Sequence, residues 1–383
     1  MAISLSAYQV ADLCLGKPPL RSLSSSCTVA AALAALKSAD DTFISVWSCD
    51  HKRNLDCDCV CVGKVCMVDI ICYLCKKENT SSPALALNKP LSVLLSDVND
   101  GVRHVDPSAS LLEAIDLMIQ GAQNLVVPIR SSISRRKQLQ RSLTTIHNAQ
   151  EFCWLTQEDV LRFLLSSIGL FSPIAPLPIE TLGIINTEFL SVEYNSPASS
   201  AIAAISRSLA DQTSVAVVDD EGSLIGEISP LTLACCDETA AAAILTLSAG
   251  DLMAYIDCGG PTEDMVRVVE EKLKEKKLKG MLKEIMAGTT SSQDVSNSSS
   301  SDEELSSPTT TLYRRTSSHS GRMARRAEAV VCHRGSSLVA VMIQAITRRV
   351  NYVWVMEDDC SVVGIVTFAN MLDVFREHLE SLI

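Results

Sequence analysis

Four stretches of the chain repeat the same order of apolar and polar positions. In each, an apolar or alanine-rich segment with helical spacing comes before two short runs rich in β-branched residues. The clearest copy has a helix over 198–209, strands over 214–218 and 224–228, and an Asp/Gly turn at 219–222. An acidic, glycine-containing turn between two apolar runs is typical of a β-hairpin. The pattern predicts repeated units with the outline β-α-β-β-α, which makes this a repeat protein.

The other three copies predict the same elements in the same order. The predicted elements are a helix over 29–36, strands over 43–47 and 60–65 and a helix over 70–74 in the first; a helix over 111–118 and a strand over 125–129 in the second; and a helix over 338–346, strands over 352–355 and 362–366 and a helix over 371–379 in the fourth.

A seven-residue phrase closes each unit. It starts with a small residue, has a hydroxyl or thiol at its fourth position and a polar side chain at its seventh. The copies are Gly63–Asp69, Cys153–Asp159, Gly226–Thr232 and Gly364–Asn370, and the second has cysteine where the others have glycine. The third and fourth copies match best, while the first two share mainly order and spacing.

These phrases and their flanking elements resemble cystathionine-β-synthase-type (CBS) repeats, which pair into Bateman modules. The segments Val10–Leu13 and Ala249–Met253 resemble the small helix that precedes such a unit. The whole chain is similar to the stand-alone plant CBS-domain-only proteins and to the γ subunit of AMP-activated and sucrose-nonfermenting-type kinases. The resemblance implies an α/β fold of two Bateman modules, 1–170 and 171–383. The implied repeats cover 1–80, 81–170, 171–240 and 241–383, the last with its lead-in helix and an insertion over about 261–326.

In the CBS family the cleft between paired repeats binds adenosine nucleotides. The resemblance implies that the aspartate ending the phrase accepts hydrogen bonds from the ribose, and that the hydroxyl residue three positions earlier lies near the phosphates. Asp69 and Asp159 occupy the ribose position, and Cys66 and Thr156 the hydroxyl position. A carboxylate can accept from both vicinal hydroxyls, and charge-assisted bonds are the stronger kind. The same two aspartates are also suited to capping the helices that start beside them.

The second half of the chain departs from this pattern. Thr232 and Asn370 replace the aspartate, so the resemblance implies weaker ribose binding in the C-terminal module. The family's basic residues on the phosphate side have possible counterparts in four side chains, Arg348 and Arg349 in the fourth unit and Arg130 or His104 in the second.

Composition agrees with globular α/β units. The chain has 383 residues, 47% hydrophobic and 4% aromatic, and is long enough for two modules with a core each. A net charge of -12 argues against nucleic acid or an anionic membrane surface as a partner. No apolar run approaches the length of a membrane span. The Ser/Ala-rich stretch Ser22–Ala35 resembles a plastid transit peptide, but the first unit needs it for a helix, which favours the cytoplasm.

Fifteen cysteines without a secretory signal indicate free thiols in a reducing compartment. Cys57, Cys59 and Cys61 alternate, and Cys72 and Cys75 have the spacing of a redox or metal pair. Because no second such pair and no histidine cluster accompanies them, the spacing favours core thiols over a zinc site.

Two segments interrupt the repeats. Ser131–Gln150 carries a basic loop within the second hairpin, and Thr262–Met286 is an amphipathic helix candidate that packs on its own domain or docks on a partner. Residues 288–320 have the composition of a disordered segment. Within it, Ser317 follows two arginines and Ser301 precedes three acidic residues, so both are candidate phosphorylation sites.

The sequence contains no visible nucleophile–base set, P-loop or complete metal motif, so we expect no enzymatic activity. The leading interpretation is a regulatory protein that senses AMP, ADP or ATP and modulates a protein partner, such as a kinase or another regulated enzyme. Two alternatives stay open: a nucleotide-independent interaction scaffold with degenerate repeats, and a γ-type subunit of a kinase complex.

Overall fold

Four small sheets form the framework of the protein. The computed structural model describes residues 8–38, 42–48, 59–95, 101–129, 150–257, 262–283 and 328–381. In this part of the chain each predicted repeat holds one three-stranded sheet. The first strand of each sheet pairs in parallel with the second, and the second pairs antiparallel with the third. The α/β fold of four repeated units is therefore confirmed.

Each unit consists of three strands and the helices between and after them. Unit 1 contains β1 Ser22–Ser24, α2 Val29–Ser38, β2 Phe43–Ser48, β3 Val60–Cys66 and α3 Met67–Leu74; unit 2 contains β4 Val102–His104, α6 Leu111–Ile119, β5 Asn124–Ile129, β6 Glu151–Thr156 and α7 Gln157–Ser166; unit 3 contains β7 Leu190–Glu193, the 3-10 turn η5 Ala198–Ala201, α8 Ile202–Asp211, β8 Val215–Val218, β9 Leu224–Ile228 and α9 Pro230–Leu233; and unit 4 contains β10 Val331–His333, α14 Leu338–Arg348, β11 Tyr352–Met356, β12 Val362–Thr367 and α15 Phe368–Ser381.

Further short helices connect the units. They are α1 Val10–Leu13, α4 Lys77–Thr80, α5 Pro83–Leu87, η2 Leu91–Leu94, η4 Ile168–Phe171, α10 Ala240–Thr246, α11 Ala249–Asp257 and α12 Glu263–Glu275.

The second helix of units 1 and 4 starts earlier than the sequence pattern predicts. α15 begins at Phe368 rather than at Met371, and α3 begins at Met67 rather than at Ile70. The fourth residue of the closing phrase has extended backbone in unit 1, where Cys66 is the N-cap of α3. The last three residues of each phrase therefore form the first turn of a helix, which places the seventh side chain at the helix N-terminus.

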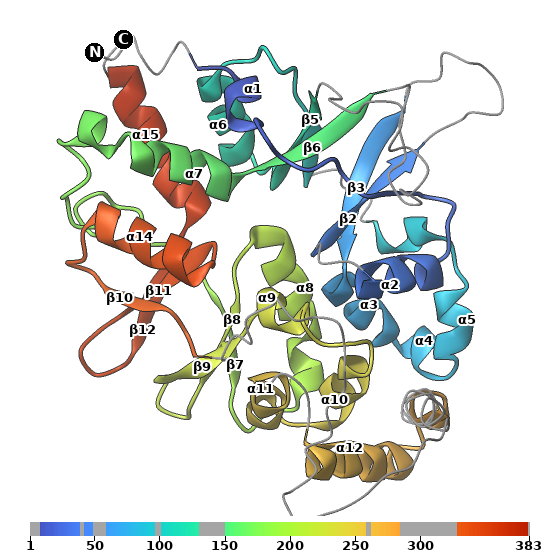
Figure 1. Ribbon diagram of the computed structural model, residues 1–383. Coiled ribbons are helices and arrows are strands. Elements are labelled where there is room, and N and C mark those ends of the chain that lie inside the picture. The colour runs from blue at the N-terminus through green and yellow to red at the C-terminus, as the bar shows by residue number, and fades with distance from the viewer. Residues whose placement is uncertain are drawn as a thin grey trace, which may run out of the picture.

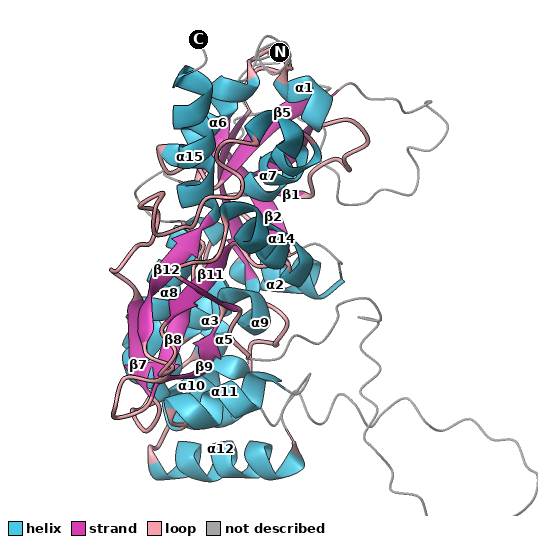
Figure 2. Ribbon diagram, turned by 90° about the vertical axis from the view of Figure 1, so that its left-hand side faces the viewer, coloured by secondary structure: helices cyan, strands magenta, loops and turns pink. Residues whose placement is uncertain are grey.

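The units contact one another in two different ways. Within a module the sheets meet: Trp47 of unit 1 packs against Phe152 of unit 2, with ring centroids 4.9 Å apart. Between modules the helices meet, unit 1 with unit 3 and unit 2 with unit 4. The four units lie around a common centre in Figure 1 and form a narrower body in the side view of Figure 2.

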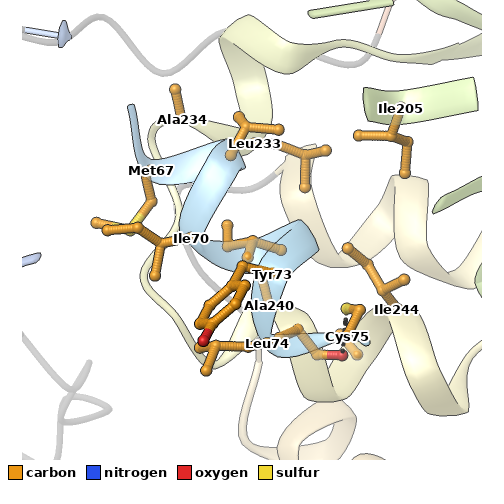
Figure 3. Packing of buried hydrophobic residues seen from close by; sticks show 14 of the residues in the cluster. Met67, Ile70, Tyr73, Leu74, Cys75, Ile205, Leu233, Ala234, Ala240 and Ile244 are labelled. Atoms are coloured by element: carbon orange, nitrogen blue, oxygen red, sulfur yellow. Dashed lines mark hydrogen bonds between the residues drawn. The ribbon is translucent and has the colours of Figure 1, made fainter. Parts of the chain in front are cut away.

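The two large hydrophobic cores run between the modules. One joins unit 1 to unit 3, and the other joins unit 2 to unit 4. Figure 3 shows Ile70 and Leu74 of α3 beside Leu233 of α9 and Ile244 of α10. All four side chains are buried. The expectation that each module has a core of its own is therefore wrong, because the apolar faces of the helices are covered by the other module.

The lead-in segments are exchanged within each module. α1 precedes unit 1 in sequence but lies on unit 2, where the Val10 N–H donates to the Ala109 carbonyl over 2.9 Å. The segment before unit 2 in turn lies on unit 1, with the Leu91 N–H donating to the Cys27 carbonyl over 2.6 Å. The expectation of two lead-in helices is confirmed, and each lies on the partner unit of its module.

The C-terminal module repeats this exchange. Ala249 of α11 donates its N–H to the Ser196 carbonyl in unit 3 over 2.8 Å, and Leu338 of unit 4 donates to the Leu177 carbonyl over 3.0 Å. The exchange also explains a glycine of the closing phrase. A Cβ atom on Gly364 would lie 2.4 Å from the backbone oxygen of Asn186, because this lead-in segment crosses β12.

The amphipathic segment after α11 packs on its own domain, as one of the two alternatives predicted. Val269 and Leu273 of α12 are buried in the core that joins units 1 and 3. Figure 2 shows α12 alongside α10 and α11 at one end of the molecule. The predicted continuous helix over 262–286 is wrong in one respect: α12 ends at Glu275, and Lys277 adopts a left-handed backbone with φ 57°.

Residues 131–149 of the predicted basic loop and the whole segment 288–320, with Ser301 and Ser317, lie outside the described residues. In the part of the chain that the structure describes, no helix is both long and apolar enough to cross a bilayer.

Candidate functional site

The closing phrase of unit 2 forms a compact hydrogen-bonded group at the start of α7. The Asp159 Oδ2 atom accepts from the Thr156 N–H over 2.8 Å and from the Thr156 hydroxyl over 2.7 Å. The Asp159 N–H donates back to the Thr156 Oγ1 atom over 3.2 Å. This is a capping box, which satisfies two backbone donors at a helix N-terminus reciprocally. The capping role expected for Asp159 is confirmed.

Lys17 completes this group from the lead-in segment. Its Nζ atom lies 2.5 Å from Asp159 Oδ2, and the two side chains are 21% and 26% exposed. All three hydrogen bonds to the carboxylate therefore end on one oxygen. Among the described residues the other oxygen, Oδ1, accepts no hydrogen bond. A partly exposed carboxylate oxygen without a protein donor is able to accept from a bound molecule.

Unit 4 reproduces the geometry with an amide in place of the carboxylate. The Asn370 Oδ1 atom accepts from the Thr367 N–H over 3.0 Å and from the Thr367 hydroxyl over 2.7 Å. Because the amide oxygen must face these two donors, the NH₂ group points where Asp159 has its open oxygen. Unit 4 therefore presents a donor where unit 2 presents an acceptor.

Unit 1 has a weaker version of the same group. The Asp69 Oδ2 atom accepts from the Cys66 N–H over 2.7 Å, so the capping role of this aspartate is confirmed as well. Burial raises the pKa of Asp69, although the Cys66 N–H and the ammonium of Lys64 act in the opposite direction. Cys66 is buried, and its thiol is a poorer hydrogen-bond partner than the Thr156 hydroxyl.

Lys64 extends from β3 of unit 1 toward unit 2. Its ammonium donates to the Asn124 side chain and lies 4.5 Å from the centroid of the Phe43 ring. Burial lowers the pKa of Lys64 to about 8, although the charges of Cys66 and Asp69 oppose this shift. The cation therefore lies at the contact between the two sheets of the N-terminal module, near Asp69.

In unit 3, protein groups engage both positions of the phrase that correspond to Thr156 and Asp159. Thr232 is buried, and its hydroxyl donates to the Ser229 carbonyl over 2.8 Å, as a helix side chain does. The Ser229 hydroxyl lies 3.1 Å from the hydroxyl of Tyr352 in unit 4. Unit 3 therefore does not reproduce the hydrogen-bonded pair of Thr156 and Asp159.

A buried carboxylate joins units 3 and 4. Glu227 is 4% exposed, and its oxygens accept from the Tyr352 hydroxyl over 2.9 Å and from the Trp354 indole N–H over 2.7 Å. Burial, and secondly the charge of Glu227, raises the pKa of Tyr352 well above its usual value. This position is Lys64 in unit 1, so the two modules have opposite charges at equivalent contacts.

Of the side chains proposed for the phosphate side, His104 takes part in the contact between units 1 and 2. The His104 Nε2 atom accepts from the Cys61 N–H over 3.0 Å, and burial lowers the pKa of this histidine. It is therefore an uncharged part of the contact between the two sheets. Arg348 and Arg349 are exposed at the end of α14, and Arg130 lies outside the described residues.

The cysteines provide no metal centre in the described part of the chain. No three His, Cys, Asp or Glu side chains there come together as a metal ion requires. Cys75 is buried in the core, and burial raises the pKa of Cys61 and of Cys72 to about 12. These thiols are protonated near neutral pH, as expected of core residues.

The four residues that the sequence proposed for the site form two hydrogen-bonded pairs, one within each phrase: Cys66 with Asp69, and Thr156 with Asp159. No hydrogen bond or ion pair between described residues joins the two pairs. Sequence reasoning missed Lys17, Lys64 and Glu227. The lysine and the glutamate at the second position of the phrase were visible in the sequence, but Lys17 reaches Asp159 only through the exchange of lead-in segments.

Several known proteins are similar to the chain in sequence. It is 52% identical over 394 residues to the CBS domain-containing protein CBSX5 of Arabidopsis thaliana, covering 100% of both chains. It is 27% identical over 412 residues to CBSX6 of the same plant, covering 95% of this chain and 92% of that one. Identity to the SNF1-related protein kinase regulatory subunit gamma-like PV42b is 20% over 333 residues, covering 84% of this chain and 77% of the relative.

A solved structure agrees with the fold. Protein MJ1225 from Methanocaldococcus jannaschii, proposed to be an archaeal homologue of γ-AMPK, superposes with a TM-score of 0.55 at 14% identity, covering 96% of this chain and 100% of that one. No model of a protein family matches the sequence. The relative that is 52% identical over the full length decides the assignment, and the four-unit fold agrees with it: the chain belongs to the CBS domain-containing proteins.

Proposed function

We propose that this protein is a non-enzymatic regulator that binds an adenosine nucleotide at unit 2 and modulates a partner protein. One observation carries the proposal: the donors to Asp159 all lie on Oδ2, so Oδ1 of this partly exposed side chain has no donor among the described residues. A vicinal diol such as that of ribose supplies the donors that this oxygen lacks.

The setting of Asp159 favours a polar ligand. The carboxylate lies at the N-terminus of α7, a helix of ten residues. The helix dipole supports negative charge at that end. A bond to a charged acceptor contributes about 1.5–3 kcal/mol, more than one between neutral groups. Asp159 is also held in place by Thr156, so little side-chain freedom is lost on binding.

The other units support the choice of unit 2. Asn370 of unit 4 points a donor outward, and in unit 3 the Ser229 hydroxyl already contacts Tyr352. In unit 1 the raised pKa of Asp69 makes the charged acceptor less favourable. Among the four phrases, unit 2 has the arrangement best suited to a ribose.

The names of relatives support a regulatory role. Two are named gamma-like regulatory subunits of SNF1-related protein kinases. Carried over to this chain, these names support a kinase or another regulated enzyme as the partner. The proposed ligand, AMP, ADP or ATP, rests on the resemblance to CBS repeats and on the open oxygen of Asp159. We place this activity in the cytoplasm, since the first unit uses Val29–Ser38 as its helix α2 rather than as a transit peptide.

Calorimetric titration of the intact protein with AMP, ADP, ATP and S-adenosylmethionine tests the proposal. The intact chain is needed because the hydrophobic cores run between the modules. Asp159→Asn keeps an oxygen for Thr156 and replaces the open acceptor by a donor. We expect the affinity to fall by about 10- to 100-fold, since about 1.4 kcal/mol corresponds to a factor of ten.

Asn370→Asp is the matched control, because it makes the reverse change in the same geometry. It should leave the affinity of unit 2 unchanged. If wild type and Asp159→Asn bind with equal affinity, the ligand does not bind at Asp159 of unit 2. If none of the four compounds binds to wild type, nucleotide sensing is excluded.

A nucleotide-independent scaffold is the second candidate. The contact of Glu227 with Tyr352 and Trp354 favours it, because the protein's own side chains occupy the place between units 3 and 4. A γ-type subunit of a kinase complex is compatible with both the nucleotide-binding regulator and the nucleotide-independent scaffold. It predicts that the protein purifies from its native source together with a kinase.

A further inference from the structure

We infer that Lys17 is the residue that recognises the phosphate of the bound nucleotide and so selects phosphorylated adenosine over adenosine itself. The inference rests on the proposed function, because it assigns a second part of the ligand to the site around Asp159. It adds a residue from the lead-in segment, outside all four closing phrases.

Lys17 is held in position from both sides. Before it, Val10 and Cys14 are buried in the core of units 2 and 4, and the Lys17 N–H donates to the Cys14 carbonyl over 3.2 Å. After it, the Leu20 N–H donates to the Phe152 carbonyl of β6 over 2.8 Å. Gly16, with φ +76°, provides the left-handed turn between these anchors. The lysine is therefore fixed at the backbone before any ligand arrives.

The ammonium of Lys17 has hydrogen-bonding capacity to spare. It carries three N–H donors, and Asp159 Oδ2 takes one of them. No other residue in the described ranges accepts from it. The side chain is 21% exposed, so its remaining donors are open to a molecule that binds at Asp159.

The position beside Asp159 gives this cation a second effect. A carboxylate that binds ribose also repels the negative phosphate a few bonds away. Lys17 neutralises that charge and offers donors to the phosphate oxygens, which charge-assisted bonds favour. Without Lys17, the charge of the Asp159 carboxylate would repel the phosphate with no nearby cation to offset it. Removal of the lysine should therefore abolish the preference for AMP over adenosine rather than weaken the binding of both compounds equally.

Titration calorimetry of the intact protein with AMP and with adenosine tests the inference. We expect wild type to bind AMP at least about 10-fold more tightly than adenosine, because an ion-paired hydrogen bond is worth roughly that much or more. Lys17→Met should lower the affinity for AMP by about 10- to 100-fold and change the affinity for adenosine by less than about 3-fold. Lys17→Arg, which keeps the charge, should retain the preference for AMP.

Lys37→Met is the matched control. Lys37 also forms an ion pair, with its Nζ atom 2.6 Å from Glu238 Oε1, but between α2 and the segment after α9. It should change neither affinity. Circular dichroism checks folding, and Lys17→Gln replaces Lys17→Met if the latter does not fold.

The outcomes separate the inference from the proposed function. If Lys17→Met binds AMP as wild type does, the inference is wrong and the nucleotide site stands. If Lys17→Met loses affinity for AMP and for adenosine by the same factor, Lys17 only positions Asp159, and phosphate recognition by Lys17 is excluded. If wild type binds neither compound, both the proposed function and the inference fail.

Discussion

The second residue of the closing phrase distinguishes the two modules at the scale of single side chains. It is Lys64 in unit 1 and Glu227 in unit 3, and each side chain contacts the partner unit of its module. A buried charge is tolerated only with partners, which here are Asn124 for the lysine and Tyr352 with Trp354 for the glutamate. The equivalent contact therefore contains an ammonium group in one module and a carboxylate in the other.

Lys64 should make the stability of the protein depend on alkaline pH. Burial lowers its pKa from 10.5 to about 8. Below about pH 8 the amine is charged in both states, and its burial lowers the free energy of unfolding. As the pH rises toward 10.5 the folded state has already released the proton, so this destabilisation disappears. The free energy of unfolding of wild type should therefore rise relative to that of Lys64→Met across this interval.

Urea denaturation of both proteins at several pH values between 7 and 10.5 measures this difference. Lys89→Met, at an exposed position, controls for the loss of one positive charge. A difference between wild type and Lys64→Met that stays constant with pH would show that the ammonium is well solvated.

Glu227→Gln should destabilise the contact between units 3 and 4. The carboxylate accepts from two buried donors, Tyr352 and Trp354, whereas an amide has one oxygen and turns its NH₂ group toward one of them. A buried donor left without an acceptor costs about 1–3 kcal/mol. The free energy of unfolding should fall by about that amount in denaturant titrations. Glu221→Gln, in the exposed turn between β8 and β9, should change it by less than about 0.5 kcal/mol.

A second substitution confirms the origin of the loss. Tyr352→Phe removes one donor, so its effect should be smaller in the Glu227→Gln background than in wild type. Strictly additive effects would mean that the two side chains do not interact.

At the scale of secondary-structure elements, most helices and strands were predictable because apolar periodicity and turn residues act locally. β8 and β9 were expected at 214–218 and 224–228 and occur at Val215–Val218 and Leu224–Ile228. The errors occur at helix ends, where one or two residues determine where the helix begins or stops. Thr367 caps α15, which begins at Phe368, three residues before the predicted start. The left-handed backbone of Lys277 interrupts the helix that was predicted to continue beyond α12.

At the scale of the whole molecule, the modules depend on each other. The core of units 1 and 3 contains α3, α8 and α10, and that of units 2 and 4 contains α6, α14 and α15. Polar contacts cross the centre as well: the Gln212 side chain donates to the Gln123 carbonyl over 3.2 Å, and Asn351 lies 3.4 Å from Gln212. Three units therefore meet directly there.

This arrangement predicts how the two halves of the chain behave. Separately produced fragments 1–170 and 171–383 would each expose apolar helix faces that the intact protein buries. Mixed together, they should form a one-to-one complex, because burial of apolar surface drives association. Sedimentation velocity of each fragment and of the mixture measures this. Two folded, monomeric fragments that do not associate would show that the cores between modules contribute little.

The sequence by itself determined the units, because the order of helices and strands follows from the local spacing of apolar residues and from turn chemistry. It also identified Asp69 and Asp159 as residues at equivalent positions of two units, because both end the repeated phrase. Only the tertiary structure decided which units share a core and which lead-in segment lies on which unit. Those contacts join residues far apart in the chain, as Lys17 and Asp159 are, and no local pattern encodes them. The ammonium of Lys17 beside one oxygen of Asp159 is therefore a property of the fold.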